Sequence, residues 1–403
     1  MTSQTTATVS GEDAVRGPVV ARARWAITGV FFVNGLLIAT YLVRIPSLRV
    51  GLGLTEPQLA GVLTCFSVAA LLAMQSVGAL VARFGSVRVI RVTLAALPFA
   101  LAGIGAAGDV TQLAAAVTLA GAVHGILDVA MSSHAVAVER LLGRPIMNGC
   151  HAAWGTSSII ASLTGAAAAG IPVWVHTTGV AAVALPAGVV VGRWLLPTGT
   201  DRQTAGGTPR QTWRTGWTRP VLVFGSIGLV LMLCEAAVIS WSGVFLHEDR
   251  GATLAVAAVG YGAFTSCQTL GRLGGDRLTE RFGRVRVFRA HACVVVAGFA
   301  VVVLGPSQYV AIAGFAVLGY GTSVLVPLIF STVGHIGGDG AATFVARVAT
   351  FTYTGILTGP ALVGWLGQGI GLTWTFAALI PLVGAVALGA GVLTTHAGPG
   401  QRG

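Results

Sequence analysis

The sequence contains no lysine, and charged residues of either sign make up only 9% of its 403 positions. Soluble globular domains carry about 25% charged residues, so this composition argues against a soluble enzyme and against a disordered protein. Five cysteines, none in a zinc-like spacing, argue against a disulfide-rich secreted scaffold. The sequence also lacks a Walker loop and any evident nucleophile–base pair or metal-ligand cluster. We therefore expect neither an enzyme nor a cofactor or metal site.

Apolar residues fill 54% of the sequence and stand in long runs. A membrane-spanning helix needs about 20 such residues, which leaves room for about twelve helices with short connections. The sequence therefore predicts an all-α polytopic membrane protein embedded in the lipid bilayer. The expected spans are Trp25–Val43, Leu59–Val81, Val87–Ala107, Thr111–Ala137, Met147–Ala168, Val173–Leu196, Pro220–Leu246, Leu254–Leu278, Val285–Leu304, Tyr309–Val333, Ala342–Gly367 and Leu372–Leu393.

The net charge of +11 comes from arginines in the short segments between apolar runs. With the N-terminus in the cytoplasm, 19 of the 24 arginines fall in cytoplasmic segments, whereas Arg44, Arg49 and Arg250 fall outside. Arg272 and Arg347 stand near the inner ends of their helices. The positive-inside rule explains this bias better than nucleic-acid binding does, so we expect no nucleic-acid partner and place both termini in the cytoplasm.

The chain divides near its middle at Pro197–Arg219, a polar segment rich in Thr, Gly and Arg. Two nine-residue segments, Arg83–Arg91 and Arg281–Arg289, match at seven positions with an offset of 198, which indicates a duplicated half. The expected organisation is an N-terminal tail at 1–24, a six-helix bundle at 25–196, a cytoplasmic linker at 197–219, a second pseudo-symmetric bundle at 220–393 and a cytoplasmic tail at 394–403.

The segment Gly78–Arg88 resembles the inner-loop signature of the major facilitator superfamily (MFS) of secondary transporters, with Ala82 where the family has an acid. The second copy keeps the acid, Glu280, but has Asp276 in place of the leading glycine. The resemblance implies the MFS fold and a charged latch between the halves; alternatively, the arginines only orient the loops. The latch candidates are Arg83, Gly85, Glu280, Arg281 and Gly283.

A narrower resemblance rests on the segments Leu127–Met131, His151–Trp154 and Gly271–Arg277, which are similar to the fucose-permease-like branch of bacterial permeases. Characterised members of that branch are proton–sugar symporters of the bacterial cytoplasmic membrane. The branch places acids in the first and fourth helices. Here Asp128 occupies the fourth, but Asn34 stands at the centre of the first, so a sugar is not carried over.

Resemblance to the superfamily also implies that helices 1, 4, 7 and 10 line a central cavity, where their mid-depth polar residues would meet. A carboxylate at the bilayer centre costs about 2.5–3.5 kcal/mol on insertion scales, which favours a use for Asp128 and Glu235 in proton coupling. His124 lies four residues before Asp128, on the same helical face, and is the third proton-coupling candidate. Alternatively, the two acids only hydrogen-bond across the bundle. The substrate-binding candidates are Asn34, Tyr320, Thr322 and Ser323.

Two further features bear on gating. Gly359-Pro360 in the eleventh span is a hinge candidate, because glycine permits close contact and proline permits a bend. His151 and Trp154 begin the fifth span, where either gating or packing would explain them. The fifth span lacks the Gly-Pro pair that drug antiporters of the superfamily carry, which weakens an efflux interpretation.

These residues favour a monomeric, proton-coupled secondary transporter of a small molecule that works by alternating access, with uptake symport ahead of efflux of a drug or natural product. A remote alternative from another class is a sensor or intramembrane enzyme on the same scaffold that has lost transport. The short linker holds no sensor domain, and no catalytic pair can be placed.

Overall fold

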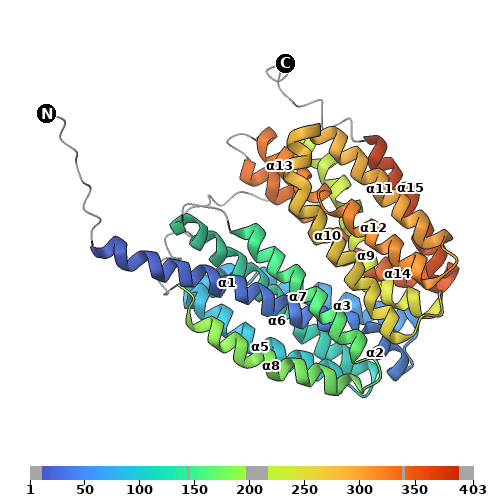
Figure 1. Ribbon diagram of the computed structural model, residues 1–403, viewed down its shortest axis with the longest axis horizontal. Helices are drawn as coiled ribbons and strands as arrows, with labels where there is room; N and C mark the ends of the chain where they lie inside the picture. Colours follow the sequence, from blue (N-terminus) through green and yellow to red (C-terminus); the bar gives the residue numbers. More distant parts are fainter. Residues whose placement is uncertain (1–10, 143–145, 197–216, 338–340, 390–403) are drawn as a thin grey trace.

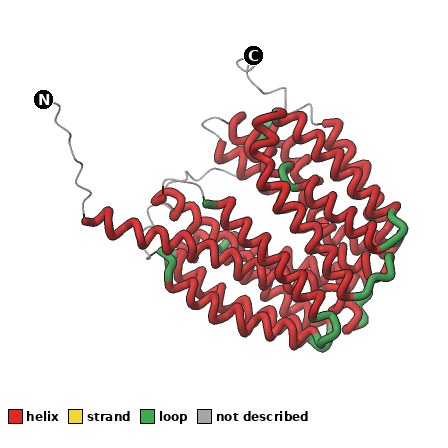
Figure 2. The backbone as a smooth tube through the Cα atoms, viewed as in Figure 1, coloured by secondary structure: helices red, strands yellow, loops and turns green. Residues whose placement is uncertain are grey.

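The computed structural model describes residues 11–142, 146–196, 217–337 and 341–389, and these residues form helices and short loops without a strand among them (Figure 2). Of the predicted linker at 197–219 only residues 217–219 are described, and the predicted C-terminal tail at 394–403 lies outside the described residues. Of the predicted N-terminal tail at 1–24, residues 11–24 are described, and they form the beginning of α1 instead of a separate tail. Helices of the two halves form two bundles that meet beside α2 and diverge toward the opposite end (Figure 1). The all-α polytopic fold with two six-helix bundles is as predicted.

The first bundle contains α1 (Gly11–Val43), α2 (Ile45–Leu52), α3 (Glu56–Met74), α4 (Val77–Phe84), α5 (Ser86–Ala106), α6 (Val110–Leu142), α7 (Met147–Ala167) and α8 (Val173–Arg193). The second contains α9 (Arg219–Glu248), α10 (Leu254–Phe282), α11 (Arg284–Leu304), α12 (Gln308–Thr322), α13 (Leu325–Gly337), α14 (Ala341–Ile370) and α15 (Leu372–Gly389). The twelve predicted spans account for all of these helices except the short α2, which lies in a segment expected to be a loop.

Two predicted spans consist of two helices each, and a serine stands at each interruption. The hydroxyl of Ser76 donates to the carbonyl of Ala73 at 2.7 Å between α3 and α4, and that of Ser323 donates to Tyr320 at 2.6 Å between α12 and α13. A serine that bonds a nearby carbonyl competes with the backbone ladder of the helix. Hydropathy alone did not reveal these breaks, since the apolar runs continue across both.

The sequence repeat forms the same turn in both halves. Gly85 joins α4 to α5 with φ 81° and ψ 149°, and Gly283 joins α10 to α11 with φ 81° and ψ 150°. Each glycine N–H donates to a carbonyl four residues back, on Val81 and Thr279 respectively. Only glycine adopts this backbone conformation readily, so the repeat encodes a sharp corner between two antiparallel helices.

The largest contacts between the halves are those of α7 with α10 and of α3 with α14. The hydroxyl of Ser162 on α7 donates to the carbonyl of Ala258 on α10 at 2.7 Å. Nearer the surface, Arg49 of α2 forms an ion pair with Glu248 of α9. We call this side of the molecule, where α2 lies and the halves are tied together, the closed end.

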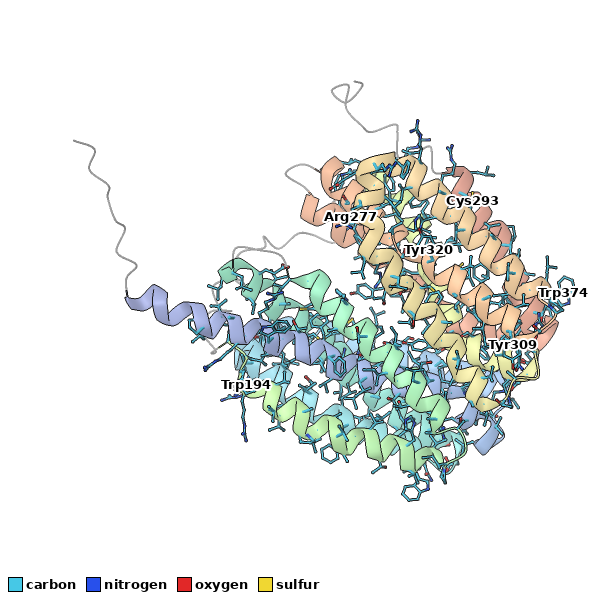
Figure 3. The ribbon with its side chains drawn as sticks, in the orientation of Figure 1. Trp194, Arg277, Cys293, Tyr309, Tyr320 and Trp374 are labelled. Atoms are coloured by element: carbon cyan, nitrogen blue, oxygen red, sulfur yellow. The ribbon has the colours of Figure 1, made fainter. Side chains whose placement is uncertain are left out.

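Nine helical segments among the described residues are long and apolar enough to cross a membrane by themselves. The predicted spans that do not reach this threshold are α7, α10 and α14, which all pack at the interface between the halves. Exposed aromatic side chains mark the two ends, with Trp194 at one and Tyr309 and Trp374 at the closed end (Figure 3). Such aromatic belts are typical of membrane–water interfaces.

Candidate functional site

In the first half, the polar groups at mid-depth form one chain of contacts. Asn34 of α1 is fully buried, and its side-chain oxygen lies 3.1 Å from Nδ1 of His124 on α6. The ring of Phe66 on α3 stacks on the other side of His124, with 5.7 Å between ring centroids. The amide nitrogen of Asn34 has no hydrogen-bond partner in the described part of the chain, so a buried donor remains for a ligand.

Asp128 follows His124 by one turn of α6, and both face the interior of the molecule. Its carboxylate acts electrostatically on His124, on His151 of α7 and on Tyr353 of α14. Because α14 belongs to the second half, Asp128 lies where the two bundles face one another. The structure thus brings together the sequence-predicted trio of Asn34, His124 and Asp128.

In the second half, Glu235 of α9 is joined to the discontinuity between α12 and α13. Gln268 on α10 is a polar neighbour of the Glu235 carboxylate. The Gln268 amide nitrogen in turn donates to the hydroxyl of Thr322 at 3.3 Å. The Gln268 side chain is only 6% exposed, so it is a buried hydrogen-bonding group inside the second half and not a surface group. Thr322, a predicted substrate ligand, therefore shares Gln268 as a neighbour with Glu235.

Arg272 of α10 lies between the two acidic centres. Its guanidinium acts electrostatically on Glu235 within its own half and on His151 of the other half. One turn away toward the closed end, Gly155 of α7 packs closely against the side chain of Thr269 on α10, so the two helices approach closely there. His151 and Arg272 lie just beyond this close contact and are both exposed.

The structure does not bring Tyr320 and Ser323 into the same group. The Tyr320 ring stacks on His291 of α11, with 5.0 Å between centroids, and His291 Nδ1 lies 3.2 Å from the carbonyl oxygens of both Tyr320 and Gly321. Figure 3 shows Tyr320 among the helices of the second half. His291 therefore supports the end of α12, and the Ser323 hydroxyl bonds back to the same turn.

The predicted latch residues occupy the two repeat corners. Arg83 stacks on the ring of Phe84 at 5.1 Å, and Arg281 stacks on Phe282 at 5.3 Å, so each arginine packs beside its own corner. Glu280 is exposed and forms no ion pair with any residue that the structure describes. These contacts lie within single halves.

The hinge candidate lies inside an uninterrupted helix, since α14 continues through Pro360. Gly359 packs against the backbone of Leu233 on α9. The indole nitrogen of Trp241 donates to the Pro360 carbonyl at 3.0 Å. Close packing of α14 on α9 is thus the evident local role of these residues.

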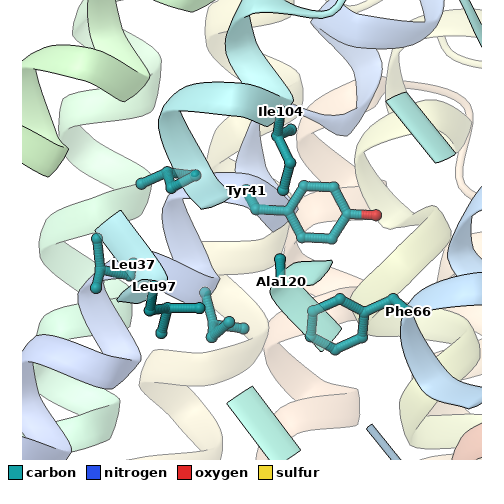
Figure 4. Close-up of a pocket in the computed structure, with 8 residues that line it drawn as sticks. Leu37, Tyr41, Phe66, Leu97, Ile104 and Ala120 are labelled. Carbon is teal, nitrogen blue, oxygen red and sulfur yellow. The ribbon is translucent and has the colours of Figure 1, made fainter. Parts of the chain in front are cut away.

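A small pocket lies beside the first-half site, but its lining is apolar (Figure 4). Leu37, Leu97, Ile104 and Tyr41 surround it, and the Tyr41 ring stacks on Phe66 with 5.8 Å between centroids. Phe66 separates this pocket from His124, so the pocket offers no polar group to a ligand. Among the described residues, no cluster of three or more His, Cys, Asp or Glu side chains is arranged to hold a metal ion.

Sequence reasoning missed Gln268 and Arg272, and left His151 undecided between gating and packing. Arg272 was counted with the arginines near inner helix ends, although it stands inside an apolar run. A signal was present: Gln268 and Arg272 are four residues apart, which places both on one helical face. Their closeness to Glu235, however, depends on how α9 and α10 pack.

Residues 27–345 match the family model described as Major Facilitator Superfamily. A protein described as an uncharacterized MFS-type transporter of Yersinia pestis is 31% identical over 368 residues, which cover 90% of this chain and 94% of the relative. The membrane protein MosC of Rhizobium meliloti is 29% identical over 358 residues, covering 86% and 84%.

Solved structures agree on the fold. The crystal structure of a point mutant of the nucleoside transporter NupG superposes with a TM-score of 0.77 at 12% identity, covering 92% of this chain and 100% of that one. A bacterial homologue of the human lysosomal transporter Spinster, in an inward-facing and occupied conformation, gives a TM-score of 0.76 at 13% identity, covering 94% and 97%. At these identities the likeness is one of fold.

Proposed function

The chain belongs to the Major Facilitator Superfamily, and from this premise we propose that it is a proton-coupled secondary transporter of a small molecule. That it is an integral bacterial membrane protein of a transporter family follows from its relatives. The proposal adds proton coupling and alternating access. The observation that supports it most is the presence of one acidic side chain on each side of the α7–α10 contact, Asp128 in the first half and Glu235 in the second.

Asp128 is suited to coupling because its surroundings change when the halves move, and Glu235 is linked to the same movement through Arg272. Asp128 acts on Tyr353 across the halves, and both Asp128 and Arg272 act on His151. Rocking one bundle against the other alters these distances, and so alters the free energy of holding a proton at Asp128. It also changes the surroundings of Arg272, which is the charged neighbour of Glu235. A proton and a substrate can then favour the same conformation without touching one another.

The contacts at the closed end define one of the two conformations that alternating access requires. Arg49, Ser162 and their partners tie the halves together there, while His151 and Arg272 are exposed beyond the last close contact of α7 and α10. If the arginine-rich loops face the cytoplasm, as the positive-inside rule predicts, this state is open inward.

Uptake symport remains our preferred direction, with proton-driven efflux as the second candidate. The polar groups at mid-depth favour a hydrophilic substrate, which a symporter would accumulate. The absence of a Gly-Pro pair from α7 also argues against a drug antiporter. The proposed place in the fucose-permease-like branch rests on short motifs, and Asn34 departs from its pattern of acids.

A flux experiment in proteoliposomes tests the proposal. Proton movement is followed with a pH-sensitive dye when sugars, sugar acids or lipophilic antibiotics are added to the wild type, Asp128→Asn, Glu235→Gln and the control Asp109→Asn. Asp109 is a suitable control because its carboxylate accepts from the backbone N–H of Gln112 at an exposed helix start.

We expect at least one compound to move protons with the wild type and with Asp109→Asn. Both central variants should lose this coupled flux while still exchanging substrate down its gradient. Proton-driven accumulation that persists in Asp128→Asn and in Glu235→Gln would refute the assignment of coupling to these acids.

A further inference from the structure

Arg272 is held in a fixed direction by the helix on which it stands. The preceding Gly271 packs directly against the side chain of Ser323 at the discontinuity between α12 and α13, so α10 lies close against this turn. Gln268, one turn earlier, is buried and braced to Thr322. Arg272 shares the helical face of Gln268 and is therefore directed toward Glu235 and the opposing half.

The Arg272 guanidinium is exposed and carries five N–H donors. In the described part of the chain it makes no hydrogen bond and no ion pair within 4 Å, although Glu235 and His151 are near enough to act on it electrostatically. A guanidinium without a partner at this depth is costly unless it faces water or a ligand. Its donors are therefore available to an incoming anion.

The charges around Arg272 limit which anion fits. Asp128 and Glu235 already lie in the same region, so a doubly charged phosphate would meet two negative groups. A single carboxylate matches one guanidinium, because two parallel N–H groups can bond its two oxygens. On the opposite half, the unpartnered amide nitrogen of Asn34 is fully buried and offers a donor to a hydroxyl or carbonyl oxygen elsewhere on the ligand.

We propose that Arg272 binds the carboxylate of a small hydroxylated monocarboxylic acid, and that Glu235 competes for the same guanidinium when this site is empty. The inference rests on the proposed transport function and names the class of its substrate. A proton on Glu235 removes the competing charge, so the guanidinium is left to the substrate. By linkage, a bound carboxylate favours proton uptake at Glu235, which gives symport of acid anion and proton.

The pH dependence of this site depends on the charged groups that face Glu235 and Arg272. Among the described residues of the elements packed against α9, the charged or titratable side chains that interact electrostatically with Glu235 are Arg272 and Tyr261, both of α10. His151 of α7 faces Arg272 and also responds to Asp128. Binding is expected to be tighter at acidic than at alkaline pH, as long as the ligand itself stays ionised.

Thermal unfolding of the full chain in detergent tests this with matched pairs of probes. The pairs are glucuronate with glucose, galacturonate with galactose, and gluconate with sorbitol, each at acidic and alkaline pH. The variants are Arg272→Gln, Arg272→Lys and Glu235→Gln, with Arg277→Gln as the control. Arg277 is an exposed arginine farther along the same helix (Figure 3).

We expect a carboxylate to stabilise the wild type more than its neutral partner does, with the larger effect at acidic pH. Arg272→Gln should weaken that binding about 10- to 100-fold, as loss of a charged hydrogen bond does. Glu235→Gln should bind equally at both pH values, Arg272→Lys should retain part of the affinity, and Arg277→Gln should match the wild type.

The proposal is overturned if no carboxylate stabilises the wild type beyond its neutral partner, a comparison that needs no variant to fold. It is also overturned if Arg272→Gln keeps its unliganded melting temperature and binds like the wild type. Proton uptake in vesicles separates the two claims. If carboxylates bind in an Arg272-dependent way but no proton flux follows, the carboxylate site is retained and coupled transport is rejected. If only a neutral sugar drives proton flux, coupled transport is retained and the carboxylate site is rejected.

Discussion

Nη2 of Arg49 lies 2.7 Å from Oε2 of Glu248, and this ion pair joins α2 of the first half to α9 of the second. The same guanidinium nitrogen is 3.7 Å from Oε1 of Glu56, so Arg49 stands between two carboxylates. The pair belongs to the closed end, and it cannot persist if the halves separate there. It therefore stabilises one conformation of the transporter over the other.

Breaking this ion pair should shift the molecule toward opening at the closed end. For Arg49→Ala we expect a loss of about 1 kcal/mol, typical of a partly exposed pair, and hence a several-fold larger open population. Distances between spin labels on α2 and α10 would measure the shift. The charge-swapped double variant Arg49→Glu with Glu248→Arg should restore the closed population; identical distance distributions in Arg49→Ala and the wild type would contradict the prediction.

The two repeat corners should respond alike to substitution. Alanine at Gly85 or Gly283 has to adopt φ 81° with ψ near 150°, which costs about 1–3 kcal/mol. Thermal unfolding should show a comparable destabilisation for Gly85→Ala and Gly283→Ala. Gly78→Ala is the matched control, since a Cβ there meets no atom within 4 Å. Equal melting temperatures for all three variants would be inconsistent with this account.

Glycine at 355 should be needed for packing of α14 on α9. A Cβ at Gly355 would run into the backbone of Leu229, which cannot give way as a flexible side chain can. We expect Gly355→Ala to lose about 1–3 kcal/mol by overpacking. Gly369→Ala lies in open space on the same helix and should be neutral. A variant at 355 as stable as the control would show that α9 and α14 can separate without cost.

Asn34 and His124 should be energetically coupled through the contact between their side chains. Removing either partner strands a buried polar group, so each alanine variant should cost about 1–3 kcal/mol. The double variant should then lose about 1 kcal/mol less than the sum of the single losses. Thr40→Val combined with His124→Ala provides the comparison, because the Thr40 hydroxyl bonds only within α1, to Leu36, and additivity is expected. Additivity of the Asn34 and His124 losses would refute the contact.

The twelve spans could be predicted from long apolar runs, and the duplication from a nine-residue repeat, because both signals are local in the sequence. The short helix α2 and the breaks at Ser76 and Ser323 could not. A helix of eight residues gives little periodicity, and a serine bonding to its own turn leaves hydropathy unchanged.

Polar residues at the centre of apolar runs identified Asn34, His124, Asp128 and Glu235, since their burial cost is visible in the sequence. Tyr320 stands equally near the middle of its apolar run, but its ring stacks on His291 of α11. The position of a residue along a helix does not tell which neighbouring helix its side chain faces. Arg272 was harder still, because an arginine in an apolar run is equally consistent with snorkelling toward the interface.

Glycines 355 and 359 leave no layer of side chains between α14 and α9, and Trp241 fastens the Pro360 carbonyl to the same neighbour. Because the backbones of α9 and α14 touch, no side chains between them can rearrange to let one helix slide along the other. We therefore expect the two helices to move together as one rigid unit. Whatever flexing the transport cycle demands must then occur elsewhere. In the second half we expect this bending at the interruption at Ser323 between α12 and α13. Ser323 packs against Gly271, the residue that precedes Arg272.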